Sequence, residues 1–98
     1  MWVRIGAMYA SRVRINSTKG MIGHLLGGAS GVEGVATVMS VFRQRIHPNV
    51  NLDHPEDEVD TEVLMGGEAR DAEIEVALSN SFGFGGHNST VAFRRWRE

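Results

Sequence analysis

The 98-residue sequence contains no cysteine. This absence excludes disulfides, thiolate metal sites and a cysteine nucleophile from these residues. Long apolar runs are also missing, since the apolar stretches are too short and too interrupted to span a bilayer. The first fifteen residues lack the apolar run of a secretory signal. We therefore expect a soluble protein with no membrane span.

Neither sign of charge dominates the chain. Ten Lys and Arg residues against twelve Asp and Glu residues give a net charge of −2, which lacks the basic footprint of a nucleic-acid binder. Residues 1–50 contain a single acid, Glu33. The acidic stretch 53–62 includes a proline and predicts a solvated loop. The histidines show no metal-ligand spacing, so we predict no metal site.

Residues 30–45 have the pattern of a helix. Ser30 and Glu33 fit a capping box, in which the serine side chain accepts a backbone hydrogen bond and the glutamate reaches back. A narrow polar stripe runs at i, i+4, i+7 and i+11, and it consists of Glu33, Thr37, Ser40 and Gln44. Most other positions are apolar, which is typical of a helix inside a protein. A chain of this length has too few other elements to wrap such a helix.

Strand signals lie on both sides of this helix. Residues 73–79 alternate acidic and apolar side chains, and the pattern of residues 89–96 predicts a closing strand. The glycine-rich residues 80–88 between them predict adjacent antiparallel strands. We also expect a short strand at 12–16, a loop at 17–28, and either a third short strand or a loop at 62–65.

The glycine-rich segment 16–30, NSTKGMIGHLLGGAS, places Lys19 and His24 just ahead of the helix. A helix N-terminus disfavours an imidazolium, so His24 is expected to be a neutral N–H donor suited to an oxygen that gains negative charge. The alternative is a buried structural histidine bonded to a backbone carbonyl. Lys19 is either a surface lysine or the partner of Glu33 in an ion pair that pins the loop to the helix.

A second glycine-rich segment surrounds two aromatic rings. Phe82 and Phe84 are flanked by Gly83, Gly85 and Gly86. Because glycine accepts backbone angles closed to other residues, this turn can move or expose its amides. Alternatively, both rings are core residues at the end of a hairpin.

Three stretches, NSTKGMIGHLLGGASGVEGVATV, HPNVNLDHPE and LSNSFGFGGHNSTVAFRRW, together resemble the C-terminal end of a β-ketoacyl-acyl-carrier-protein synthase. Residues 14–98 carry the resemblance, and residues 1–13 form an unmatched N-terminal segment. The GGHNS sequence is more similar to the plastid enzymes of plants and algae than to bacterial ones, which implies a plastid location.

The resemblance implies a thiolase-like α/β fold, in which two similar halves layer helices between sheets. The chain would be the final strand–helix–strand–strand portion of the second half, an incomplete layered domain. Its apolar helix would be the one sandwiched between the two sheets.

The implied activity is that of an acyltransferase in fatty acid biosynthesis, a decarboxylative Claisen condensation. In this reaction an acyl group rests on a cysteine, and the carbanion left when malonyl-carrier protein loses carbon dioxide attacks the thioester. The implied partners are acyl carrier protein bearing an acyl or malonyl thioester and a second subunit in a homodimer. No cofactor is implied.

Site residues follow from the same resemblance. His24 matches the second active-site histidine, which donates to the malonyl thioester oxygen as enolate charge builds. Lys19 matches the motif lysine, which organises the site through Glu33. Phe84 matches the gating phenylalanine, whose backbone N–H contributes to the oxyanion hole. Phe82 lies beside it, and the supporting glycines are Gly83, Gly85 and Gly86.

The nucleophilic cysteine and the first histidine of the family lie upstream of the matched region. The isolated chain therefore cannot form the acyl-enzyme, and we predict that it is inactive as a condensing enzyme. The alternative function is that of a truncated, non-catalytic piece that associates with a full-length synthase or with itself, because its apolar helix would leave a large exposed patch.

Overall fold

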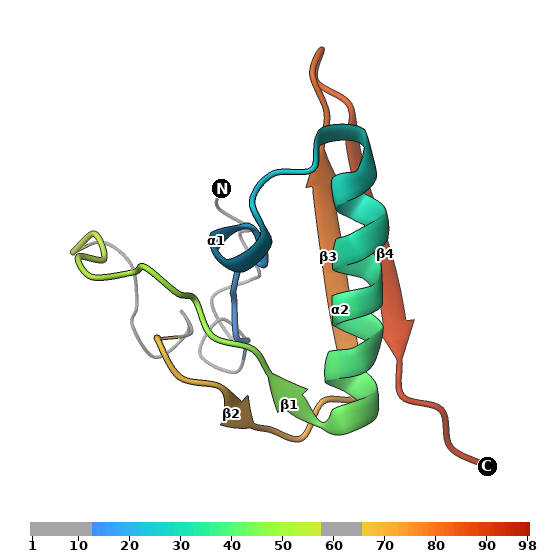
Figure 1. Cartoon of the computed structure of the whole chain (residues 1–98). Helices are drawn as coiled ribbons and strands as arrows, with labels where there is room; N and C mark the ends of the chain where they lie inside the picture. The colour runs from blue at the N-terminus through green and yellow to red at the C-terminus, as the bar shows by residue number, and fades with distance from the viewer. Residues whose placement is uncertain (1–12, 58–65) are drawn as a thin grey trace.

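The computed structural model describes residues 13–57 and 66–98. Helix α2 (Ala29–Arg43) lies along an antiparallel hairpin formed by β3 (Val76–Phe82) and β4 (Asn88–Arg94), as Figure 1 shows. The helix and the hairpin make two layers, and they confirm the helix and the paired strands that the sequence predicts. The strands lie a few residues away from the predicted bounds.

Four short elements accompany these two layers. They are α1 (Lys19–Ile22), the 3-10 turn η2 (Leu26–Gly28), β1 (Arg45–Ile46) and β2 (Arg70–Asp71). β1 and β2 pair antiparallel. The sequence did not predict this pairing, because strands of two residues are too short to show an alternating pattern. The loop predicted at 17–28 thus contains two helical turns. Of the strand predicted at 12–16, the described part retains an isolated bridge at Ile15. The expectation for 62–65 falls on residues outside the described ranges.

The start of α2 differs from the predicted capping box. The helix begins at Ala29 with Gly28 as its N-cap, and no side chain caps it. Because η2 runs directly into α2, Ser30 lies inside the first helical turn. The N-cap position is already occupied by Gly28, so the Ser30 side chain cannot act as the cap. The capping-box prediction is therefore wrong, and Glu33 is used elsewhere.

The end of α2 is fixed by Gln44. This residue adopts a left-handed conformation that terminates the helix. Its side-chain amide donates to the Ile74 carbonyl at 2.9 Å and accepts from the Ile74 N–H at 2.8 Å. Reciprocal bonds of this kind satisfy both backbone groups of Ile74 and hold the chain entering β3 against the helix end.

The hairpin presents its two faces to different surroundings. The pairing Ser81↔Ser89 and Ser79↔Val91 places small and apolar side chains on the face toward α2. Successive residues of a strand point to opposite faces, so Leu78 and Phe82 lie on the other face. Both of these side chains are exposed. Within the described structure, nothing covers this outer face of the hairpin.

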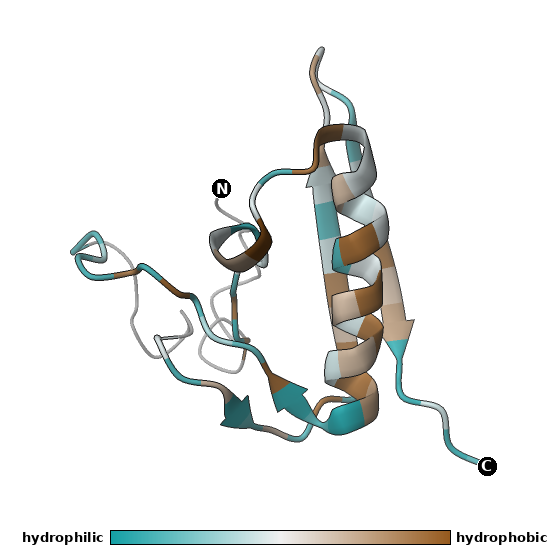
Figure 2. Cartoon of the chain, viewed as in Figure 1, coloured by the Kyte–Doolittle hydropathy of each residue, from teal (hydrophilic) through white to brown (hydrophobic). Residues whose placement is uncertain are grey.

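Helix α2 is covered on one side only. In the described residues, the buried apolar side chains are Ala29 and Val41. An exposed apolar stripe with spacing 3, 4, 3 runs along the helix and consists of Val32, Val35, Met39 and Phe42. Figure 2 shows apolar residues at several positions along α2. Within residues 13–57 and 66–98 this stripe of the helix stays uncovered, in line with the expectation for a chain of this length.

Candidate functional site

Lys19 and Glu33 form an ion pair between the N-terminal loop and the helix. Lys19 is the first residue of α1, and Glu33 lies in the second turn of α2. The Lys19 side chain is 37% exposed and that of Glu33 is 12% exposed, so the carboxylate is largely shielded from water. The ion pair that the sequence allowed is formed, and it pins the loop against the helix.

His24 follows the end of α1. Gly23, at φ 75°, turns the chain there with a backbone conformation that favours glycine. The Leu26 N–H then donates to His24 Nδ1 at 2.9 Å. A backbone N–H can only donate, so Nδ1 is an acceptor, and the neutral ring carries its proton on Nε2.

The surroundings of His24 differ from those of a structural histidine. Its side chain is exposed, and its bonded nitrogen accepts from an N–H instead of donating to a carbonyl. Among the described residues, no protein group partners Nε2. The Nε2–H is therefore available to an oxygen supplied from outside this part of the chain.

The Phe84 turn closes the hairpin. The Gly83 N–H donates to the His87 carbonyl at 2.6 Å, and Gly85 and Gly86 have φ values of +85° and +83°. These angles are unfavourable for residues with a side chain, which explains the glycine pair. Phe84 is 91% exposed at the tip, and the Phe82 side chain is also exposed. The two rings are thus not core residues of this structure.

The His24 loop and the Phe84 turn lie at the same end of the molecule. Ser30, in the first turn of α2, lines one groove together with Ser81 and Ser89, which come next to the ends of the turn. In Figure 1 the start of α2 and the β3–β4 turn lie at the same end of the two layers. His24, six residues before Ser30, leads into that end of the helix.

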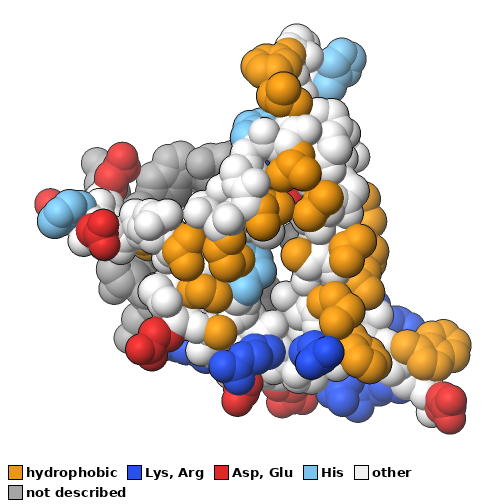
Figure 3. Space-filling model, in the orientation of Figure 1, with side chains coloured by type: hydrophobic (Ala, Val, Ile, Leu, Met, Phe, Trp, Pro, Cys, Tyr) orange, Lys and Arg blue, Asp and Glu red, His pale blue; other side chains and the backbone are white. Residues whose placement is uncertain are grey.

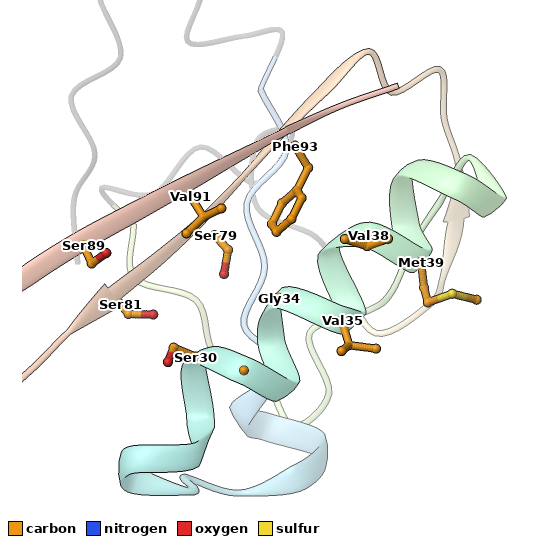
Figure 4. Close-up of a pocket in the computed structure, with 11 residues that line it drawn as sticks. Ser30, Gly34, Val35, Val38, Met39, Ser79, Ser81, Ser89, Val91 and Phe93 are labelled. Carbon is orange, nitrogen blue, oxygen red and sulfur yellow. The ribbon is translucent and has the colours of Figure 1, made fainter. Parts of the chain in front are cut away.

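The groove itself lies between α2 and the hairpin and has a volume of about 570 Å³. Its walls carry small residues such as Gly34 and Ser79, and Figure 4 shows Phe93 directed from β4 toward the helix. The Phe93 ring lies 4.0 Å from the position that a Cβ on Gly34 would take. The lining residues do not include Lys19, His24 or Phe84, so the groove is a separate feature from the candidate site.

Sequence reasoning missed a set of contacts that hold the loop before Lys19. His47 Nε2 lies 3.0 Å from Thr18 Oγ1, and His47 Nδ1 lies 3.1 Å from Asn16 Nδ2. The Ser17 N–H donates to Asn49 Oδ1 at 2.7 Å. The available signal was the polar side chain at every second position of HPNVN.

Other features of the described chain, such as the Glu75–Arg97 ion pair, lie apart from the Lys19–His24 loop. Glu75 hydrogen-bonds Arg97 and raises the pKa of its guanidinium, at the end of the hairpin away from the turn. The described part of the chain contains no group of three or more His, Cys, Asp or Glu side chains placed to hold a metal ion. Nor does any helix in that part have the length and apolar character needed to cross a membrane.

Comparison with known proteins identifies the family. Residues 4–53 match the C-terminal domain of β-ketoacyl synthases. The chain belongs to the β-ketoacyl synthase family. Its relatives include the chloroplastic 3-oxoacyl-[acyl-carrier-protein] synthase II of Arabidopsis thaliana, which is 52% identical over 85 residues. This match covers 87% of the present chain and 16% of the relative.

Bacterial relatives give the same result. The 3-oxoacyl-[acyl-carrier-protein] synthase 2 of Synechocystis is 47% identical over 89 residues, or 91% of this chain and 21% of the relative. The enzyme of the same name from Vibrio harveyi is 43% identical over 94 residues, or 96% of this chain and 22% of the relative. The chain spans about a fifth of the length of these curated relatives.

The family resemblance read from the three sequence stretches is confirmed by these matches. The matched range also includes residues 4–13, for which the sequence alone indicated no resemblance. The division of the chain at residue 13 stays a prediction. Chloroplastic and bacterial relatives both occur, so the plastid location stays a proposal.

Proposed function

We propose that this chain forms the C-terminal part of a thiolase-like condensing domain and supplies part of its active site. The reaction is the decarboxylative condensation of an acyl group with malonyl-carrier protein in fatty acid biosynthesis. Family membership and the names of the relatives support this reaction class. The observation that carries the role of this chain is the hydrogen bond from the Leu26 N–H to His24 Nδ1.

His24 acts at the step that builds negative charge. When malonyl thioester loses carbon dioxide, the electron pair of the broken C–C bond moves into the thioester, whose oxygen becomes enolate-like. The His24 Nε2–H donates to that oxygen, and one well-aimed donor of this kind is worth about 10²–10³ in rate. Because Leu26 holds the ring by its other nitrogen, the donor needs no tautomer change before it acts.

Lys19 acts through Glu33. The ammonium and the partly buried carboxylate hold the start of the His24 loop on α2, so the imidazole keeps its orientation relative to the helix. Lys19 is thus a positioning residue in this proposal, and His24 is the catalytic one.

Phe84 acts from the other side of the site. Its backbone N–H contributes to the oxyanion hole for the acyl thioester, and its ring gates access. Gly85 and Gly86 give the turn the backbone freedom that gating needs, and the exposure of Phe84 leaves the ring free to change position. Phe82 and Gly83 support the turn at the end of β3.

The acyl group rests on a cysteine that this chain does not contain. The carbanion attacks the thioester carbonyl, and the cysteine leaves as a thiolate. That nucleophile and the first histidine belong to the larger part of the synthase. We propose acyl carrier protein as the substrate carrier, a homodimer as the intact enzyme and the plastid as its location.

A chimera tests this function. In the Arabidopsis synthase II, the C-terminal portion is replaced by residues 14–98 of the present chain, and malonyl-dependent elongation is measured. The chimera is expected to condense, the isolated chain is expected to be inactive, and His24→Ala in the chimera is expected to lower kcat by about 10²–10³. His54→Ala, in an exposed loop, is the control and retains activity. A folded His24→Ala chimera with unchanged elongation would refute the proposal.

A second candidate function rests on the apolar stripe. Val35 is 65% exposed and Phe42 is 76% exposed, and Figure 3 shows apolar side chains along this face of the molecule. A non-catalytic piece that associates with a full-length synthase or with itself would cover them. A monodisperse monomer that melts cooperatively and does not bind the Arabidopsis synthase would exclude this candidate.

A further inference from the structure

We infer that residues 47–51, His-Pro-Asn-Val-Asn, form a clamp that sets the position of Lys19. The clamp lies directly after β1 and contacts residues 15–20, about thirty positions earlier in the chain. Its link to catalysis rests on the proposed function, whereas its geometry does not. The clamp residues are positioning residues, since none of them is required to touch substrate.

The clamp makes one contact after another along the loop. Its alternate residues His47, Asn49 and Asn51 each bond to the loop. His47 meets Asn16 and Thr18, Asn49 accepts from the Ser17 N–H at 2.7 Å, and Asn51 lies 3.4 Å from the Gly20 carbonyl. His47 and Asn49 reach the first part of the loop, and the turn at Val50 and Asn51, where Asn51 has a φ of 64°, brings the Asn51 amide to Gly20.

His47 is the central contact because both of its ring nitrogens are used. The Asn16 amide nitrogen donates to the His47 carbonyl at 2.9 Å and lies 3.1 Å from Nδ1. An amide NH₂ cannot accept, so in the tautomer with the ring proton on Nε2, Nδ1 accepts from Asn16 and Nε2 donates to Thr18 Oγ1 at 3.0 Å. The Pro48 carbonyl, 3.0 Å from Nδ1, competes as an acceptor for the other tautomer.

The loop depends on these outside contacts. Helix α1 has four residues, no buried side chain and no side-chain cap, and a helix of one turn is not stable by itself. Thr18, which His47 holds, is the N-cap of α1, and its carbonyl accepts from the Met21 and Ile22 N–H groups. The histidine therefore fixes the residue from which α1 starts, and Lys19 is the next residue.

Gly20 shows how close the clamp lies. A Cβ at this position would be 3.1 Å from the Val50 carbonyl oxygen and 3.4 Å from a Val50 methyl group. A side chain here would push α1 away from the clamp. Because the Lys19 ammonium spans from α1 to Glu33, such a shift would change the ion pair directly.

The test uses the fact that Lys19 is the only lysine in the sequence. Reductive methylation of the full 98-residue chain with ¹³C-formaldehyde labels one side chain, apart from the α-amine, and leaves its charge in place. Glu33→Gln gives the NMR position of an unpaired Lys19. We expect His47→Ala and Asn49→Ala to move the label to that position, while the hairpin amide signals stay unchanged.

Three further variants sharpen the result. His47→Gln, whose amide can still donate to Thr18, is expected to restore most of the paired signal. Thr18→Val removes the hydroxyl but keeps the branched shape, and it is expected to move the label to the unpaired position. It replaces His47→Ala as the test if His47→Ala does not fold. His54→Ala is the matched control and leaves the label unmoved. A paired Lys19 signal in His47→Ala, Asn49→Ala or Thr18→Val would overturn the inference.

A kinetic arm separates the clamp from the proposed function. In the chimera, His47→Ala is expected to lower kcat about tenfold with little change in KM for the acyl substrate, because displaced catalytic groups lose rate steeply with distance. A shifted label with unchanged kcat would leave the clamp in place and would remove Lys19 from the catalytic proposal. An unmoved label with reduced kcat would overturn the clamp and leave the catalytic proposal standing.

Discussion

Lys19 and Glu33, fourteen residues apart, join the first residue of α1 to the second turn of α2. His24 lies between them in the sequence, so the ion pair closes the loop that carries the imidazole. The loop is therefore held at both ends, by the pair at Lys19 and by its continuation through η2 into α2. A single charge pair thus links a structural contact to the candidate catalytic side chain.

Removing either member of this pair should destabilise the protein. Lys19→Met leaves a largely shielded carboxylate without its partner, and Glu33→Gln leaves the ammonium without its charge. Each is expected to cost about 1–3 kcal/mol in the chimera, between the values for exposed and buried pairs. Urea unfolding of the chimera measures the loss. In the double variant the second substitution should add little, and full additivity would show that the two groups do not interact.

The glycine pair of the turn allows a matched comparison. Gly85→Ala and Gly86→Ala force a side chain into a positive φ, and each is expected to destabilise the chimera by about 1 kcal/mol. Gly67→Ala is the control, since a Cβ there meets nothing within 4 Å and its φ is not positive. Thermal unfolding of the three variants checks this. Equal effects at positions 67, 85 and 86 would contradict the conformational explanation.

The apolar stripe on α2 should govern association of the isolated chain. Val35→Glu and Phe42→Glu place a charge on exposed positions of the stripe, and they are expected to reduce concentration-dependent oligomers in light scattering. Trp96→Glu removes an exposed aromatic residue beyond the end of β4 and is expected to leave oligomers unchanged. If Trp96→Glu alone dissociated the oligomers, the stripe would not be the associating surface.

The long elements and the ion pair were predictable from the sequence. The 3.6-residue pattern over 30–45 and the two-residue alternation over 73–79 are local in the chain, and they report the type of element. They do not report which face is covered here, since Leu78 and Phe42 are both exposed. Lys19 and Glu33 could be matched because Glu33 is the single acid among residues 1–50.

The features that the sequence did not predict depend on contacts between distant segments. Ser30 and Glu33 fit a capping box, but η2 starts the helical path before Ser30 and Lys19 takes up Glu33. The bonds from His47 to Asn16 and Thr18 join segments about thirty residues apart. A repeating pattern of residues within a short stretch of sequence cannot predict a contact between segments so far apart in the chain.

Decarboxylation by the chimera, measured apart from acyl transfer, tests the role of the His24 Nε2–H most directly. With the cysteine already acylated, release of carbon dioxide from malonyl-carrier protein isolates the step in which the thioester oxygen gains charge. His24→Ala is expected to slow this release by about 10²–10³ while the rate of cysteine acylation stays within a factor of about two. Unchanged carbon dioxide release in a folded His24→Ala chimera would contradict the assignment of His24 as the donor to the enolate oxygen.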